Sequence, residues 1–212
     1  MNLEEIRTEV KLLVQDDGFD DAMINGYINQ ALLDSTSQLM LPSLKSVDTV
    51  VTSTSVAYVS VSALEGGFSG RLSRVYDSDG EEIRIVSSLE LLMDEYGNLT
   101  DAGDVECCCL EGSTLWYTLL PAAAETLTLL YYKNVEVLSG DSSTTSDIPE
   151  FCHRPVLVHG AAWMMFDTFE DGVDGAKVNT MSHRGLYEGG IVKVREWLGR
   201  NNRHYISSCW SV

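Results

Sequence analysis

Asp77, Asp79 and Gly80 come nearest in this chain to a metal-binding motif. They match the opening of a calcium-binding loop, in which alternate oxygen-bearing side chains and a glycine surround the ion. Such a loop also needs a glutamate at its last ligand position, to hold the ion with both carboxylate oxygens. Counting from Asp77, that position is Ser88. The three residues therefore predict a turn between two strands, and no calcium site.

Two further groups of side chains have the chemistry of metal ligands. Four are histidines: His153, His159, His183 and His204. Four are acids that follow a predicted helix: Asp167, Glu170, Asp171 and Asp174. The histidines match neither the spacing of helical metalloproteases nor that of zinc sites, and helix capping and solvation explain the acids as well as a cation does. The sequence therefore predicts no metal and no cofactor.

The chain has five cysteines, three of them adjacent at Cys107, Cys108 and Cys109. An odd number with this spacing is a poor disulfide framework and favours a reducing compartment during folding. Alternation along a strand would turn Cys107 and Cys109 to one face and Cys108 to the other, so we interpret the triplet as core packing. Cys152 beside His153 resembles a thiol with its base, but neighbouring residues at a helix start diverge. Because the chain also lacks a phosphate-binding glycine loop and a glycine elbow around a serine, we predict that it is not an enzyme.

Charge is distributed unevenly along the chain. Its 212 residues include 32 acids and 14 Lys and Arg, and the net charge of −18 excludes a protein that grips nucleic-acid phosphates with its whole surface. From Lys177 onward six bases and two acids give +4, which leaves −22 for the first 176 residues. We expect the basic end to meet an acidic partner surface, although an ordinary solvated acidic surface explains the rest.

No segment predicts insertion into a membrane. The longest apolar stretch, 156–166, is well short of the ~20 residues that cross a bilayer. The first residues, MNLEEIRTEV, are amphipathic and acidic, unlike a signal peptide.

The N-terminal part has the apolar period of two amphipathic helices. Asn2 and Glu5 have capping-box spacing ahead of the first helix. Asp20 or Asp21 can cap the second, which ends before Pro42.

From Val47 the apolar period changes to about two, which is typical of strands. We count about seven short strands up to Tyr132, with a hairpin around Asp79 and Gly80, and residues 88–96 could form a short helix. This pattern predicts a small antiparallel β-sandwich or barrel.

Two helices are expected near the C-terminus. After a turn at 148–151, the first begins near Pro155 and is apolar nearly all round, so it must be covered by its own domain or by neighbouring subunits. In the second, Gly189 and Gly190 should weaken the helix locally.

Together these elements predict an α+β fold with an insertion. A helical bundle of two N-terminal and two C-terminal helices forms a discontinuous domain of residues 1–45 and 148–200. The β domain, 46–138, is inserted into it and is followed by a Ser-, Thr- and Asp-rich connector, 139–147. A C-terminal arm, 201–212, ends the chain.

The chain resembles the head–tail adaptor (connector) proteins of tailed bacteriophages in short segments spread over most of its length. In chain order these are Phe19, Asp20 and Asp21 with Ile24, then 27–31 (YINQA), 57–58 (AY), 71–75 (RLSRV), 127–133 (LTLLYYK), 148–151 (IPEF) and 158–162 (VHGAA). The chain departs from the family pattern at Pro155, in the cysteine triplet and in its long C-terminal extension.

The resemblance implies a structural virion protein, assembled in the host cytoplasm. About twelve copies would form a homo-oligomeric ring beneath the portal protein and join it to a downstream tail or nozzle protein. DNA would pass through the ring without specific binding. Left open are a tail-completion or terminator subunit and, from another class, a small hydrolase or ligand-binding module.

Two groups of residues are expected to act in such a ring. The candidates for an acidic channel wall, which would repel passing phosphates, are Asp16, Asp17, Asp20, Asp21, Asp167, Glu170, Asp171 and Asp174. The candidates for binding the portal are large apolar or basic residues at the C-terminus: Arg200, Arg203, Tyr205, Ile206 and Trp210. Docking of Trp210 onto the subunit's own helices is the alternative for that arm.

Overall fold

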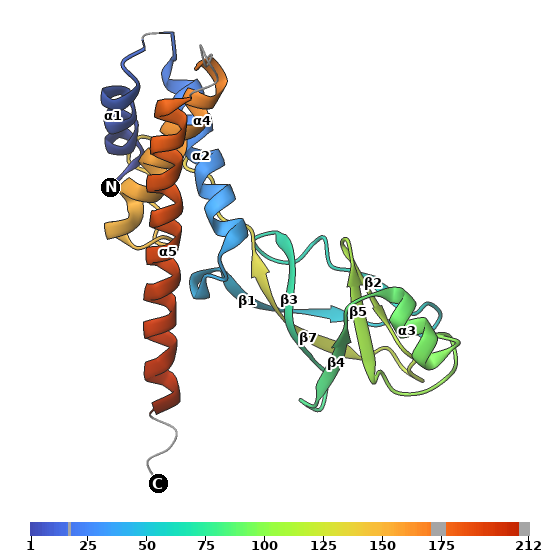
Figure 1. The fold of residues 1–212 in the computed structure, drawn as a ribbon. Helices are drawn as coiled ribbons and strands as arrows, with labels where there is room; N and C mark the ends of the chain where they lie inside the picture. Colours follow the sequence, from blue (N-terminus) through green and yellow to red (C-terminus); the bar gives the residue numbers. More distant parts are fainter. Residues whose placement is uncertain (17, 171–176, 208–212) are drawn as a thin grey trace. The chain divides into compact units, whose positions relative to one another are not determined.

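The computed structural model describes residues 1–16, 18–170 and 177–207, with 201–207 described by their backbone alone. The chain divides into two compact units (Figure 1). We call Met1–Ser43 with Val135–Val212 the helical unit, and Leu44–Asn134 the β unit. Residues 135–147, which include the predicted connector, thus belong to the helical unit.

The described part of the helical unit contains four α-helices: α1 (Leu3–Val14), α2 (Asp21–Gln38), α4 (His159–Phe169) and α5 (Val178–Ser207). The predicted capping box opens α1, since the amide of Glu5 donates to Asn2 Oδ1 and the amide of Asn2 donates to the Glu5 carboxylate, each at 2.9 Å. Asp20 caps α2 by accepting from the amide of Met23 at 2.8 Å. Side chains therefore satisfy N–H groups that have no partner within these helices.

The chain enters α4 through two short segments, the 3-10 helix η2 (Glu150–Cys152) and the π-helix η3 (Arg154–Val158). Pro155 lies in the first turn of η3, where the missing N–H of proline leaves no hydrogen bond unmade. The amide of His159 donates back to the carbonyl of Arg154, so the wide turn runs directly into α4. The predicted helix start near Pro155 is right, although its first turn is π-helical.

The apolar helix α4 is covered within its own unit. It packs against α1, α2 and α5, and Ala161, Ala162 and Met165 on it are fully buried. The sequence allowed this helix to be covered either by its own domain or by neighbouring subunits, and the structure shows the first. The apolar surface of this helix is therefore no argument for neighbouring subunits.

Two glycines let the helices approach closely. A Cβ on Gly160 would lie 2.9 Å from Cβ of Ala31, and a Cβ on Gly190 would lie 2.9 Å from Cβ of Pro155. Both distances are shorter than side chains tolerate. Gly190 also has a packing role that the sequence did not show, because α5 packs on η3 at this glycine.

Residues 138–143, which follow the β unit in the chain, bond to α1 and α2. Both amide atoms of Asn29 bond the main chain of Leu138, at 2.7 Å to its N–H and 2.9 Å to its carbonyl. Farther on, the carbonyl of Ser143 accepts from the amide of Leu3, and Asp141 pairs with Arg7 at 2.9 Å. The predicted connector is thus part of the helical unit's packing.

The β unit is built on a single seven-stranded sheet among its described residues. Its strands are β1 (Lys45–Val51), β2 (Tyr58–Ser60), β3 (Phe68–Tyr76), β4 (Glu82–Val86), β5 (Cys107–Glu111), β6 (Thr114–Tyr117) and β7 (Thr126–Lys133). They lie in the order β1-β7-β3-β4-β5-β6-β2 and curl into an open half-barrel (Figure 1). The prediction of a small antiparallel sandwich or barrel is confirmed in part: the sheet curls as a half-barrel, but it is mixed, because β4 and β5 are parallel.

A parallel pair requires a crossover, and α3 (Leu89–Tyr96) lies in it. Ser88 caps this helix, and Arg84 on β4 forms a salt bridge with Glu95 on α3. The predicted hairpin joins β3 to β4, with Val75 opposite Ile83.

Tyr117 connects the two open ends of the curled sheet. It is fully buried in the core under the sheet, and its hydroxyl accepts from the amide of Ser53 at 2.7 Å and donates to the carbonyl of Val56 at 2.8 Å. Those residues lie between the edge strands β1 and β2. The hydroxyl thus helps to hold the connection between β1 and β2, together with the bonds of Thr52 to Glu125 and of the Tyr117 amide to the carbonyl of Ala57.

Candidate functional site

The described residues contain no group of three or more His, Cys, Asp or Glu side chains that could hold a metal ion. In the predicted calcium-like segment, the Asp77 carboxylate accepts from the amides of Asp79 and Glu81, at 2.9 and 2.8 Å. These bonds form the turn between β3 and β4, as the sequence predicted.

The cysteine triplet divides between two cores. Cys108 packs under the curled sheet, whereas Cys107 and Cys109 pack on the other face against Leu92 of α3. Burial raises the pKa of the Cys108 thiol to about 12 and that of Cys109 to about 11, so neither forms a thiolate near neutral pH. The interpretation of the triplet as core packing is confirmed.

Cys152 and His153 do not form a catalytic pair. The Nε2 atom of His153 lies 2.9 Å from the carbonyl of Ile148, and its Nδ1 atom lies 3.1 Å from the amino group of Met1. Both ring nitrogens are therefore engaged away from the thiol. Burial raises the pKa of Cys152, which further disfavours a thiolate.

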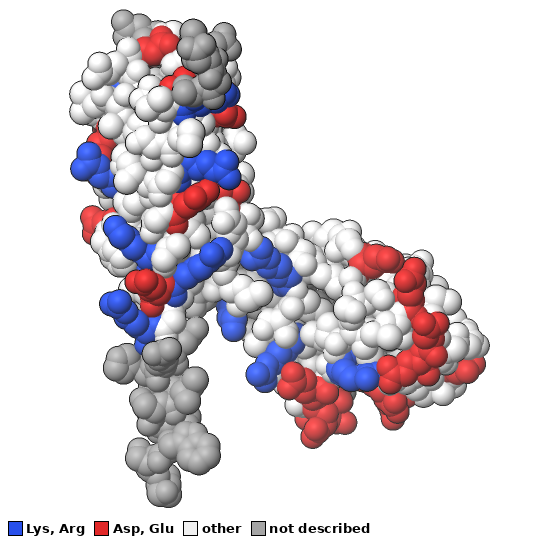
Figure 2. Space-filling view, viewed as in Figure 1, with Lys and Arg blue, Asp and Glu red and all other residues white. Residues whose placement is uncertain are grey.

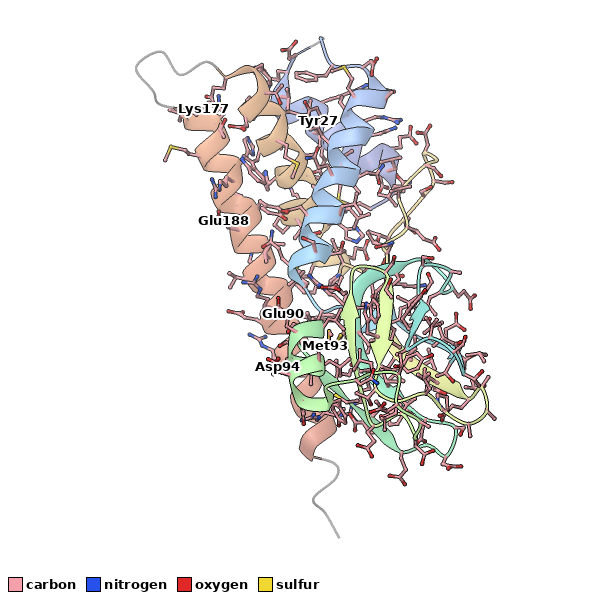
Figure 3. All side chains as sticks on the ribbon, turned by 90° about the vertical axis from the view of Figure 1, so that its right-hand side faces the viewer. Tyr27, Glu90, Met93, Asp94, Lys177 and Glu188 are labelled. Atoms are coloured by element: carbon pink, nitrogen blue, oxygen red, sulfur yellow. The ribbon has the colours of Figure 1, made fainter. Side chains whose placement is uncertain are left out.

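The candidate channel acids gather at one end of the helical unit. Phe19, between α1 and α2, contacts Phe169 at the end of α4 with ring centroids 5.4 Å apart. Tyr27 bonds Thr168 across the same junction at 3.1 Å, and Figure 3 shows Tyr27 and Lys177 toward this end of the unit. The contact joins the segment of the described candidates Asp16, Asp20 and Asp21 to that of Asp167 and Glu170. Asp17, Asp171 and Asp174 lie outside the described residues.

Most of these acids also have local structural partners. Asp21 pairs with Lys11, which lowers the pKa of the carboxyl, and Asp167 pairs with Lys177 at 2.9 Å. Glu170 accepts from the amides of Asn179 and Thr180 at the start of α5, at 3.1 and 2.9 Å, and these bonds lower its pKa. Helix capping and ion pairing therefore offset part of the negative charge that the sequence assigned to this end.

The candidate portal-binding residues lie on or beyond the end of α5. Arg200 is exposed and lies 3.7 Å from Glu196 one turn earlier. Arg203, Tyr205 and Ile206 belong to α5, which continues through Ser207 where the sequence showed no period, and their side chains are not described. Trp210 lies outside the described residues. Figure 2 shows basic side chains, with acids between them, on the helical unit, and on the β unit a group of acidic side chains beside several basic ones.

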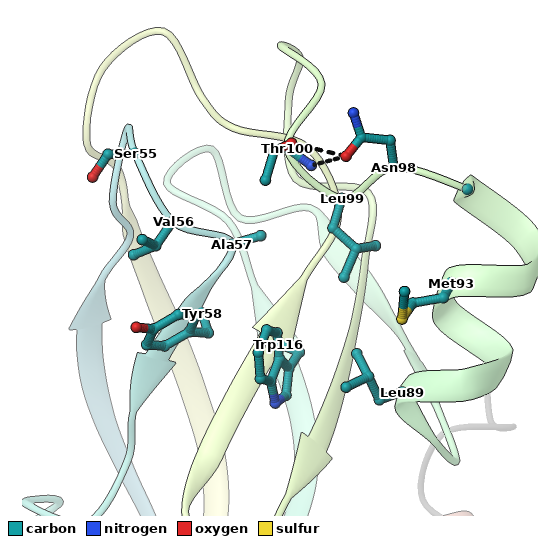
Figure 4. Close-up of a pocket in the computed structure, with 11 residues that line it drawn as sticks. Ser55, Val56, Ala57, Tyr58, Leu89, Met93, Asn98, Leu99, Thr100 and Trp116 are labelled. Atoms are coloured by element: carbon teal, nitrogen blue, oxygen red, sulfur yellow. Dashed lines mark hydrogen bonds between the residues drawn. The ribbon is translucent and has the colours of Figure 1, made fainter.

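Sequence reasoning missed an apolar pocket on the β unit (Figure 4). Its volume is about 410 Å³, and it lies between strands β2 and β6 on one side and α3 with the following loop on the other. Tyr58 and Trp116 form one wall with ring centroids 5.0 Å apart, and Leu89, Met93 and Leu99 form the other. No period in the sequence marks it, because its lining comes from β2, α3 and β6, which are separated from one another along the chain by other strands.

A pair of histidines joins α4 to α5. The Nδ1 atoms of His159 and His183 lie 3.0 Å apart, and the ring of His183 stacks on Phe166. Burial lowers the pKa of both imidazoles, and the charges of His183 and Arg154 lower that of His159 further. Glu170 acts in the opposite direction on His183. A hydrogen bond between two imidazole nitrogens needs one donor and one acceptor, so protonating both nitrogens abolishes it.

The helical unit is therefore expected to lose stability as the pH falls below about 6.5, the ordinary pKa of histidine. The unfolded chain takes up protons near that value and the folded chain only at lower pH, so the free energy of unfolding decreases on acidification in this window. A double variant, His159→Gln with His183→Gln, should show a smaller loss, with His153 still contributing because burial lowers its pKa too. Thermal midpoints at about pH 7.5 and about pH 5.5 measure the difference. An unchanged pH dependence in the double variant would refute this role of the pair.

The family model described as SU10 adaptor protein matches residues 1–205. The chain belongs to this family of phage adaptor proteins, as its resemblance to head–tail adaptors predicted. No curated protein is similar enough in sequence to serve as a relative. Among the described helices, none combines the length and apolar character of a membrane span.

Proposed function

We propose that this chain joins the capsid of a tailed phage to its tail as a ring of about twelve copies beneath the portal protein. The observation that carries the proposal is the family match over nearly the whole chain, residues 1–205. A protein that joins two assemblies works by contact alone and needs neither a metal-binding group, which the described residues lack, nor Cys152 and His153 as a catalytic pair.

In the proposed ring the acidic end of the helical unit lines the DNA channel. Asp16, Asp20 and Asp21 would repel passing phosphates, since tight binding of DNA depends on Lys and Arg side chains that displace the cations around its phosphates. The net charge of −18 is that of a surface which lets DNA slide past. The ring assembles in the host cytoplasm and contacts the portal on one side and a tail or nozzle protein on the other.

The test is to remove the chain from the phage that encodes it. Heads and tails should then accumulate separately, and supplying the intact chain should restore joined particles. Electron microscopy of the lysate counts joined and separate structures. Joined, infectious particles in the absence of the chain would refute the proposal, whereas heads joined to incomplete tails would favour a tail-completion role.

A further inference from the structure

The apolar pocket of the β unit has the features of a binding site for a peptide side chain. Tyr58 and Met93 at its mouth are large apolar residues that remain 44% and 49% exposed. Exposed aromatic and methionine side chains around a concave apolar site are typical anchors of protein interfaces. The pocket is therefore suited to one bulky apolar side chain of a partner.

The strand beside the pocket favours an extended partner. Strand β2 ends the sheet order and pairs only with β6 among the described strands, so the main-chain groups along its other side are available. An extended segment can add to such an edge while inserting a side chain into an adjacent pocket. The strand is only three residues long, so the segment it accepts is short.

The rim of the pocket favours a basic partner. Of the three carboxylates on α3, Glu95 pairs with Arg84. Glu90 and Asp94 form no salt bridge within the described part of the chain, and Figure 3 shows both on α3 beside Met93. Their negative charges would attract Lys or Arg next to the inserted side chain.

The C-terminal segment of this same chain has that chemistry. It carries the bases Arg200 and Arg203, followed by Trp210 within the last five residues. We propose that Trp210 of a second copy occupies the pocket, with its Arg200 and Arg203 near Glu90 and Asp94. This inference rests on the proposed ring, because a pocket on one copy that binds a segment of the next copy forms a head-to-tail contact, which can repeat around a closed ring. It differs from the portal-binding role that the sequence suggested for these residues.

A peptide of residues 200–212 tests the contact directly. We expect it to bind the chain truncated after residue 207, and to bind about tenfold more weakly when Met93→Lys places a cation at the pocket mouth. The matched control is Leu91→Lys, which adds the same charge to α3 at a residue that is 46% exposed and outside the pocket lining. Both positions are exposed, so neither change should disturb folding. Equal binding to the Met93 and Leu91 variants, or no binding to the truncated chain, would overturn the proposal.

Mixing two full-length variants tests whether the contact is between copies. A chain with Met93→Lys keeps the segment and loses the pocket, whereas a chain with Trp210→Ala keeps the pocket and loses the anchor. Native mass measurement should show one-to-one complexes in the mixture and a smaller fraction of complexes in either variant alone. A mixture no more associated than its components would overturn the assignment to a second copy.

The alternative is that the C-terminal segment binds the portal protein. If the chain truncated after residue 207 still forms rings but no longer binds portal, the segment belongs to the portal and the pocket proposal is wrong. This failure is distinct from that of the proposed function, since a chain that still joins heads to tails keeps its adaptor role whatever fills the pocket.

Discussion

Gly190→Ala is expected to leave the helical unit about 1–3 kcal/mol less stable than Gly189→Ala, one residue away on α5. A Cβ at Gly190 would lie 2.9 Å from Cβ of Pro155, 3.0 Å from Cγ2 of Val156 and 3.1 Å from the carbonyl carbon of Pro155. The last of these is backbone of the π-helix η3, which cannot turn aside as a flexible side chain can. Either α5 or η3 must therefore shift.

Gly189 provides the control because a Cβ there would meet nothing within 4 Å. Both substitutions gain the helical preference of alanine over glycine, about 1 kcal/mol, so their difference isolates the clash. Denaturant unfolding followed by the helical circular dichroism signal measures it. Equal stabilities for the two variants would show that α5 does not pack on η3 through Gly190.

Tyr117→Phe is expected to destabilise the β unit by about 1–3 kcal/mol. The change keeps the buried ring and removes only the hydroxyl, which accepts from the amide of Ser53 and donates to the carbonyl of Val56. Both main-chain groups would be left without this partner at the opening of the half-barrel. Because they lie between β1 and β2, the amides of residues 52–57 should also exchange with solvent faster.

Tyr76→Phe serves as the control, since its hydroxyl makes an exposed bond with Arg74 at 3.3 Å. Its effect should stay within about 0.5 kcal/mol. Thermal unfolding and hydrogen exchange of peptides from the β unit measure both variants. A Tyr117→Phe protein as stable as the control, with unchanged exchange at 52–57, would contradict the role given to this hydroxyl.

Local patterns predicted the helical part of the fold well. The capping box at Asn2 and Glu5 and the cap at Asp20 lie where the sequence placed them, because a cap depends on residues within one turn. The role of Gly190 could not be predicted, since it depends on Pro155, which is distant in sequence. A glycine in a helix is ordinarily destabilising, and only the close approach of η3 makes its replacement by alanine unfavourable here.

The order and direction of the strands in the β unit could not be predicted from the apolar period of the sequence. The strands themselves were predicted, but β4 and β5 run parallel because α3 reverses the chain between them. Residues 88–96 were recognised as a helix candidate, yet a single short helix gives no sign of which strands it joins. The apolar pocket depends on that same crossover together with β2 and β6, which other strands separate along the chain, so no period in the sequence marks it.

The structure shows where the described candidate acids lie and what they bond to, and their role in a channel stays a prediction. The two distant segments that carry these acids meet where Phe19 contacts Phe169, which their spacing alone did not reveal. The same structure engages Asp21, Asp167 and Glu170 in ion pairs and a helix cap. A count of charges in sequence therefore overstates the free negative charge of that end.

The adaptor role is tested most directly by imaging the head–tail junction of the complete phage at a resolution that distinguishes helices from strands. The account predicts a ring of about twelve copies beneath the portal. The helical unit and the β unit should each fit the density once per copy, with Asp16, Asp20 and Asp21 facing the channel. A junction whose ring density neither unit fits, or particles in which the chain lies elsewhere, would contradict the account.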